Sequence, residues 1–278
     1  VVKGKVMSMS CGWHGEMLAV GGEMLTIELY RVGTCTCLSS IVTSVATQCL
    51  SFTYDGSKLA IGTAATVSLC NVIWDPSLSE KPYITEDFSV EQGVTMGQVS
   101  FSYDGSQLAI AGEIGFNRVV SVVSTTTGAT MRKMRFEERV RCCALDLKGR
   151  RLLVGTFGRV AELYYQGLGT TMKHFACADD TVRCVYLAAP LKLLALAGDA
   201  IGRGSCVVYD TESASQNSNS PLFQIARKSP IWSVNISPDG SWLTLGGYDS
   251  TIAVYDLNEL VAAARARKSV VDIEPLQE

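Results

Sequence analysis

Apolar and polar residues alternate in short runs along most of the chain. In the runs Leu50–Phe52 and Val234–Ile236, every second side chain is apolar. This pattern predicts β-strands with one face turned towards a core. An Asp-Gly pair follows each run, and a second apolar run, Leu59–Ile61 or Leu243–Leu245, comes after it. Because Asp-Gly readily adopts the positive φ of a tight turn, we expect two antiparallel strands joined by a hairpin.

Two further strands are expected after each hairpin. Runs rich in β-branched and aromatic residues, such as Arg118–Ser124 and Thr251–Tyr255, predict a third strand. More variable runs, such as Thr130–Phe136 and Met172–Ala176, predict a fourth. Each unit is therefore predicted to be a four-stranded antiparallel meander.

The same order of strands and turns recurs six times, with turn positions 41 to 49 residues apart. These positions are Gly15, Gly56, Gly105, Gly149, Leu191 and Gly240. A period of this length is typical of a β-propeller, because one meander cannot cover both of its faces and so packs against its neighbours around an axis. An open β-solenoid is the alternative. We predict one all-β propeller domain over residues 1–278, with blades at about 1–42, 43–92, 93–137, 138–179, 180–227 and 228–278.

The final repeat, SPDGSWLTLGGYDSTIAVYDL, and stretches such as SYDGSQLAIAG resemble the WD-repeat family. Asp249 matches that family's turn aspartate, and Tyr255-Asp256 stands where the family has Trp-Asp. The chain departs from the family pattern, because no repeat has the Gly-His pair and Trp74-Asp75 lies out of frame. The resemblance implies a propeller with an incomplete blade-locking network, which depends more on core packing. Seven blades are commonest in the family, so a seventh could come from residues outside this sequence.

Seven residues are predicted to build turns. They are Asp55, Gly56, Asp104, Gly105, Asp239, Gly240 and Asp249.

Composition fits a core-rich protein, with 47% hydrophobic and 18% charged residues. The net charge is −3 and the pI about 5.6, so we do not expect nucleic acid as a partner. The most apolar stretch, Leu187–Ile201, contains charged residues and is too short to cross a bilayer. Ten cysteines without a CxxC pair suggest core thiols in a reducing compartment, the cytoplasm or nucleus.

We predict no catalytic, cofactor or metal site. The two histidines, His14 and His174, are far apart in the sequence, and no nucleophile-elbow, zinc-protease or phosphate-loop motif occurs. The glycine-rich stretches at Gly167 and Gly202 fall in expected hairpin turns. A propeller enzyme with an unrecognised central-channel site is the alternative.

Arginines supply a candidate partner-binding site. Glu137-Glu138-Arg139-Val140-Arg141 aligns with Asp179-Asp180-Thr181-Val182-Arg183 in the next repeat. The family's geometry implies that these positions share one end of the propeller with the turns between second and third strands. The arginines expected in that sector are Arg118, Arg141, Arg159, Arg183 and Arg203. They could bind an acidic or phosphorylated segment; alternatively, Glu138 and Asp180 merely pair with neighbouring arginines.

The last repeat carries Trp232 and Tyr248 at equivalent positions. Both are candidate aromatic anchors, although Trp232 could equally pack between blades. An acidic excursion at Ser79–Thr95 and a polar loop at Ser213–Ser220 are expected outside the blades. A short helix near 258–268 with a basic end should precede a final strand at Ser269–Ile273.

The function expected from this pattern is a non-catalytic protein-interaction scaffold, a subunit or adaptor of a larger assembly. Its partners would be other proteins, and the oligomeric state is left open.

Overall fold

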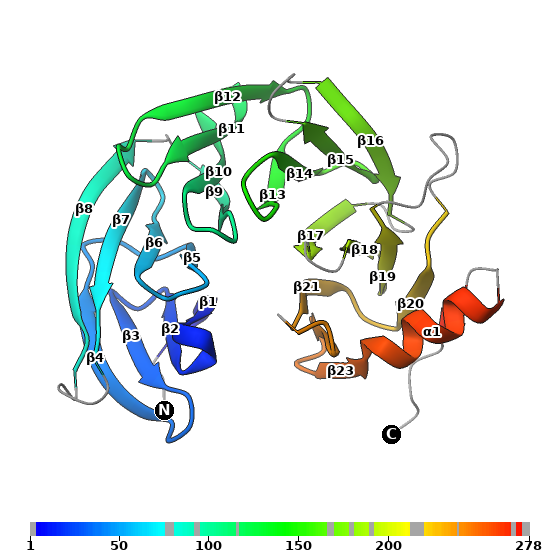
Figure 1. The fold of residues 1–278 in the computed structure, drawn as a ribbon, viewed down its shortest axis with the longest axis horizontal. Coiled ribbons are helices and arrows are strands. Elements are labelled where there is room, and N and C mark those ends of the chain that lie inside the picture. The colour runs from blue at the N-terminus through cyan, green and yellow to red at the C-terminus, as the bar shows by residue number, and fades with distance from the viewer. Residues whose placement is uncertain are drawn as a thin grey trace. The chain divides into compact units, whose positions relative to one another are not determined.

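Two compact units make up the computed structural model of the protein, Val1–Val140 and Arg141–Glu278, and each is described by itself (Figure 1). The described residues are 4–75, 81–91, 95–114, 117–165, 170–177, 181–188, 192–211, 220–237, 239–267 and 271–273.

The first unit contains three four-stranded sheets whose strands follow chain order. The first sheet is β1 (Val6–Gly12), β2 (Met17–Gly22), β3 (Thr26–Arg31) and β4 (Thr36–Val42), with a short 3-10 turn, η1 (Trp13–Gly15). The second is β5 (Cys49–Phe52), β6 (Lys58–Gly62), β7 (Thr66–Ile73) and β8 (Tyr83–Glu91). The third is β9 (Thr95–Phe101), β10 (Gln107–Ile114), β11 (Asn117–Ser124) and β12 (Thr130–Phe136).

The second unit also contains three sheets. The fourth sheet is β13 (Val140–Leu145), β14 (Arg151–Thr156), β15 (Val160–Tyr165) and β16 (Thr170–Ala176). The fifth is β17 (Thr181–Ala188), β18 (Leu193–Ala200), β19 (Arg203–Asp210), β20 (Phe223–Arg227) and the added β24 (Val271–Ile273). The sixth is β21 (Ile231–Ile236), β22 (Trp242–Gly247) and β23 (Ile252–Asp256), and α1 (Leu257–Arg267) follows it.

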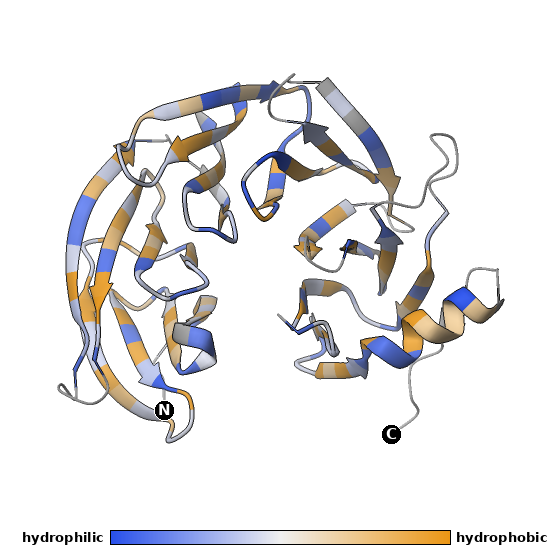
Figure 2. Ribbon diagram, in the orientation of Figure 1, coloured by the Kyte–Doolittle hydropathy of each residue, from blue (hydrophilic) through white to orange (hydrophobic). Residues whose placement is uncertain are grey.

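Consecutive sheets pack face to face within each unit. In the first unit, Met17 and Leu29 share a buried cluster with Leu59 of the next sheet. In the second, Leu153 and Phe175 pack with Leu196. Hydrophobic and hydrophilic residues alternate along the strands, as the period of two predicts (Figure 2). The predicted all-β propeller fold, with six blade-like sheets, is confirmed.

The prediction of an excursion outside the blades at Ser79–Thr95 was wrong over the part that the structure describes. Tyr83–Glu91 forms β8, which pairs with β7 along its whole length. Its acidic residues, Glu86, Asp87 and Glu91, are exposed, whereas Ile84, Phe88 and Val90 pack against buried clusters. The acidic residues on the outer side of this edge strand therefore gave its sequence the appearance of a loop. The polar loop at Ser213–Ser220 lies outside the described residues, except for Ser220.

The final strand also differs from expectation. Val271–Ile273 pairs in parallel with β20 of the fifth sheet instead of completing the sixth. The cause is α1, which lies where the helix near 258–268 was expected and begins directly after β23. The Asp256 carboxylate caps this helix by accepting a hydrogen bond from the Glu259 amide at 3.1 Å. Its buried Leu257 packs on the cluster that contains Phe223 of β20, so the helix leads the chain back to that strand. The sixth sheet has three strands among the described residues.

No helix within the described ranges is long and apolar enough to span a membrane.

Candidate partner-binding surface

Arg183 and Asp199 form a two-point ion pair in the fifth sheet. The β17–β18 register is irregular between Val182 and Cys184, and Arg183 lies at this irregularity. Its Nε lies 2.6 Å from Asp199 Oδ1 and its Nη2 2.7 Å from Oδ2, and the Thr181 hydroxyl also donates to Oδ1. The guanidinium is therefore held in one orientation.

The Asp199 carboxylate is ionised at neutral pH. Burial by itself would raise its pKa, but hydrogen bonds from Arg183 and Thr181 outweigh that effect and lower the pKa below the ordinary value. The sequence suggested Asp180 as the neighbouring acidic partner, and Asp180 lies outside the described residues. Among the described residues, Asp199, 16 residues further along the chain, pairs with Arg183.

Two exposed aromatic side chains continue from Arg183 onto the sixth sheet. The Arg183 guanidinium carbon lies 6.0 Å from the centroid of the Trp232 ring. The Trp232 and Tyr248 centroids are 5.4 Å apart, and these residues are 53% and 69% exposed. The Tyr248 amide donates to the Pro230 carbonyl at 2.9 Å, which holds the turn after β22 beside the start of β21.

Arg141 extends this cluster onto the fourth sheet. Its guanidinium carbon lies 5.1 Å from the centroid of the half-exposed Phe157 ring. Its positive charge also contributes to the lowered pKa of Asp199. We call the resulting group the arginine–aromatic surface. Its members are Arg141, Phe157, Asp199, Arg183, Trp232 and Tyr248.

The other three predicted arginines lie around or apart from this group. Arg159 is exposed in the turn two residues after Phe157, and Arg203 is exposed at the start of β19. Arg118 belongs to the first unit, where its guanidinium donates to the Glu137 carbonyl and its Nε lies 4.0 Å from a Glu113 carboxylate oxygen. Within the second unit, the positive charges of Arg141 and Arg183 both lower the pKa of Asp199.

The predicted turn residues have a shared geometry in three hairpins. Gly56, Gly105 and Gly240 have φ of 74°, 69° and 77°. The aspartate before each glycine accepts hydrogen bonds from the hydroxyl two residues earlier and from the backbone amide two residues later. The aspartates are Asp55, Asp104 and Asp239.

Asp249 takes part in a different network. Its Oδ1 accepts from the Thr251 amide at 3.1 Å and hydroxyl at 2.7 Å. Its Oδ2 lies 3.1 Å from Nη2 of Arg227, a nearly buried residue at the end of β20 that also donates to the Thr251 hydroxyl. Arg227 thus ties the fifth sheet to a turn of the sixth. This locking contact was not anticipated from the sequence.

The histidines occupy separate places. His14 is exposed in the first unit, and His174 Nδ1 lies 3.5 Å from a Glu162 carboxylate oxygen in the second. The described part of the chain has no group of three or more His, Cys, Asp or Glu residues placed to hold a metal ion.

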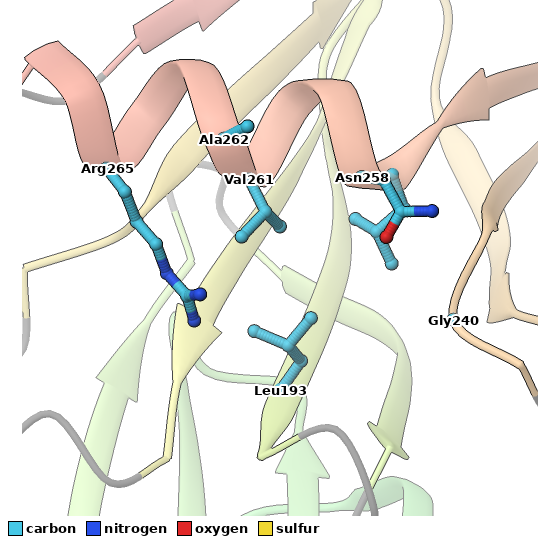
Figure 3. A pocket seen from close by; sticks show the side chains of 7 residues that line it. Leu193, Gly240, Asn258, Val261, Ala262 and Arg265 are labelled. Carbon is cyan, nitrogen blue, oxygen red and sulfur yellow. The ribbon is translucent and has the colours of Figure 1, made fainter.

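A cavity of about 270 Å³ lies under α1. Val261 and Arg265 point from the helix towards Leu193 (Figure 3). Arg265, near the basic end of this helix, lies 3.5 Å from the Asp210 carboxylate. Because pockets for drug-sized ligands measure about 300–1,000 Å³, this cavity is small for an organic ligand.

Sequence reasoning missed Asp199 and Phe157. An available signal for Asp199 was its position opposite Thr181 when residues are counted back across the β17–β18 hairpin. Phe157 stands beside a glycine in the turn that also carries Arg159. Without the strand register, neither signal shows whether the residue contributes to a surface contact or only to the local turn.

Comparison with known proteins supports the fold. The profile of the WD domain, G-beta repeat family matches residues 220–256, which contain β20 to β23. A search of curated proteins returned no match. The chain is similar in structure to Kuenenia stuttgartiensis hydrazine synthase, with a TM-score of 0.72, 14% identity, and coverage of 96% of this chain and 83% of that one. At this identity the likeness shows the fold alone. The match of one repeat to the family profile and the blade arrangement of the six sheets support a divergent member of the WD-repeat propeller family.

Proposed function

We propose that this protein is a non-catalytic interaction scaffold, a subunit or adaptor of a larger assembly, that binds a partner through the arginine–aromatic surface. WD-repeat propellers commonly bind other proteins. The observation that carries the proposal is the exposed pair of Trp232 and Tyr248 beside the fixed guanidinium of Arg183. Exposed aromatic and arginine side chains are the residue types enriched in interface hot spots.

An acidic or phosphorylated segment is the partner chemistry that this surface favours. Arg141 and Arg183 belong to the surface, and Arg159 and Arg203 lie close to it in the sequence. Asp199 is the surface's own carboxylate, and it orients Arg183, whose side chain is 25% exposed. Pre-oriented guanidinium groups bind carboxylates and phosphates at low entropic cost. Trp232 and Tyr248 would add apolar contact area.

The ten cysteines support an intracellular, reducing compartment for this scaffold. All ten are free thiols, and six of them are buried. Burial raises the pKa of Cys49 to about 12 and that of Cys70 to about 11. Such thiols remain protonated at neutral pH and serve as core residues.

The test compares partner capture by the wild type with capture by Arg141→Glu/Arg183→Glu, using affinity purification and mass spectrometry. We expect the main partner to be lost while the melting temperature stays close to that of wild type. Because Arg183→Glu would place a carboxylate beside Asp199, Arg183→Gln is the milder second variant and should weaken capture in the same direction.

Lys133→Glu/Arg135→Glu is the matched control, since it makes the same change in charge at exposed positions on β12. Capture unchanged in the first variant, or equally reduced in the control, would overturn the proposal. Turnover in a substrate screen of the purified protein would contradict the non-catalytic assignment.

A further inference from the structure

A second exposed aromatic group lies at three hairpin ends of the first unit. His14 lies between β1 and β2, Tyr54 between β5 and β6, and Tyr103 between β9 and β10. The tyrosine rings are stacked, with centroids 4.3 Å apart and an interplanar angle of 29°. His14 meets Tyr54 edge-on at 5.4 Å. Tyr54 and Tyr103 are 39% and 40% exposed. We call these three residues the aromatic row.

Hydrogen bonds between neighbouring sheets hold the hairpin ends in place. The Ser8 hydroxyl accepts from the Leu50 amide at 2.9 Å, which ties β1 to β5. The Lys58 ammonium donates to the Thr125 carbonyl at 2.6 Å, and the Thr125 hydroxyl donates to the Gly105 carbonyl at 2.6 Å. These bonds connect the hairpin that carries Tyr54 to the sheet that carries Tyr103. The row is therefore a pre-organised platform.

The hairpin ends that carry this platform also carry acidic residues. Asp55 and Asp104 each follow a tyrosine, and Glu16 follows His14 by two residues. Burial by itself would raise the pKa of Asp55, but hydrogen bonds from Thr53 and Ser57 outweigh it and lower the pKa, so this carboxylate is ionised at neutral pH. The one Lys or Arg in the three hairpin ends is Lys58, whose ammonium is engaged by the Thr125 carbonyl.

We infer that the aromatic row binds an arginine-bearing segment of a partner protein. A guanidinium plane stacks on a tyrosine face, and its N–H groups pair with carboxylates alongside. Exposed rings in hairpin ends that also carry carboxylates supply both interactions. This site lies in the first unit and selects a basic segment, whereas the arginine–aromatic surface favours an acidic one, so the two can be tested separately.

The test measures fluorescence anisotropy of a labelled peptide of alternating glycine and arginine. We expect Tyr54→Leu/Tyr103→Leu to weaken binding about tenfold or more, and Tyr54→Phe/Tyr103→Phe to keep it within about twofold, because Phe retains the ring. Asp55→Asn/Asp104→Asn should weaken binding several-fold, since Asn keeps an acceptor for the turn but lacks the charge. Glu23→Gln/Glu259→Gln removes the same charge elsewhere and should leave binding unchanged.

Melting temperatures identify variants that fail to fold. A competitor peptide of alternating glycine and lysine, the lysine peptide, tests whether binding requires arginine. If the Leu variant fails to fold, the Phe and Asn variants and competition by the lysine peptide decide whether the aromatic row binds arginine. Four results would overturn the inference: no binding by wild type, wild-type binding by a folded Leu variant, equal losses in the Asn variant and its charge control, or competition by the lysine peptide as strong as by the arginine peptide.

Discussion

At the residue scale, the turn aspartates show how a short motif produces one geometry repeatedly. In Ser237–Ser241, the Ser237 hydroxyl donates to Asp239 Oδ1 at 2.6 Å, and the Ser241 amide and hydroxyl donate to the two carboxylate oxygens at 3.1 and 2.7 Å. All these partners lie within two residues of Asp239. The turn can therefore be inferred from local sequence, as it was at Asp55 and Asp104.

These hydrogen bonds lead to a prediction about the pKa of the Asp239 carboxyl. Donation from Ser237 and Ser241 lowers the pKa of this exposed carboxyl to about 2, against about 3.9 in an unfolded chain. Because the folded pKa is the lower one, the stabilising contribution is present above about pH 4 and is lost as pH falls through about 2. Carboxyl NMR titration should show this midpoint, and Ser237→Ala/Ser241→Ala should move it up towards about 3.9. A wild-type midpoint near 3.9 would contradict the assigned hydrogen bonds.

At the element scale, the strands show which assignments depend on tertiary packing. The strands on either side of the Asp-Gly turns were predicted correctly from the alternation of apolar and polar side chains, because each such strand has one face in a core. β8 was missed, since its outward residues are acidic and only its inward face, with Phe88 and Val90, is apolar. β24 was assigned to the wrong sheet because α1 moves the chain before it pairs.

Glycines at similar places in two second strands allow a test of sheet-to-sheet packing. A Cβ at Gly155 would lie 2.5 Å from Cys142 Sγ and 2.8 Å from Val182 Cγ1, whereas one at Gly246 would meet only Ser233 Cβ, at 3.8 Å. We expect Gly155→Ala to reduce the free energy of unfolding by about 1–3 kcal/mol through overpacking. Gly246→Ala should change it by less than about 0.5 kcal/mol. Urea denaturation measures both, and equal effects would contradict the packing described between the fourth and fifth sheets.

At the scale of the whole molecule, the single domain predicted over residues 1–278 remains a prediction. Three residues, Glu137–Arg139, separate β12 from β13, so the two compact units have no long linker between them. We expect one cooperative unfolding transition in calorimetry, with a calorimetric enthalpy equal to the van't Hoff enthalpy. Two resolved transitions would show instead that the units unfold as separate domains.

The sequence by itself determined the repeat, the hairpin turns, the strand content and hence the propeller fold, because these depend on residues a few positions apart. It also singled out Arg183, Trp232 and Tyr248. Only the tertiary structure decided that Arg183 pairs with Asp199 and lies over Trp232, because those contacts depend on the register of β17 with β18 and on the packing of two sheets. The same reason applies to Tyr54 and Tyr103, 49 residues apart, whose stacking requires two hairpin ends to meet.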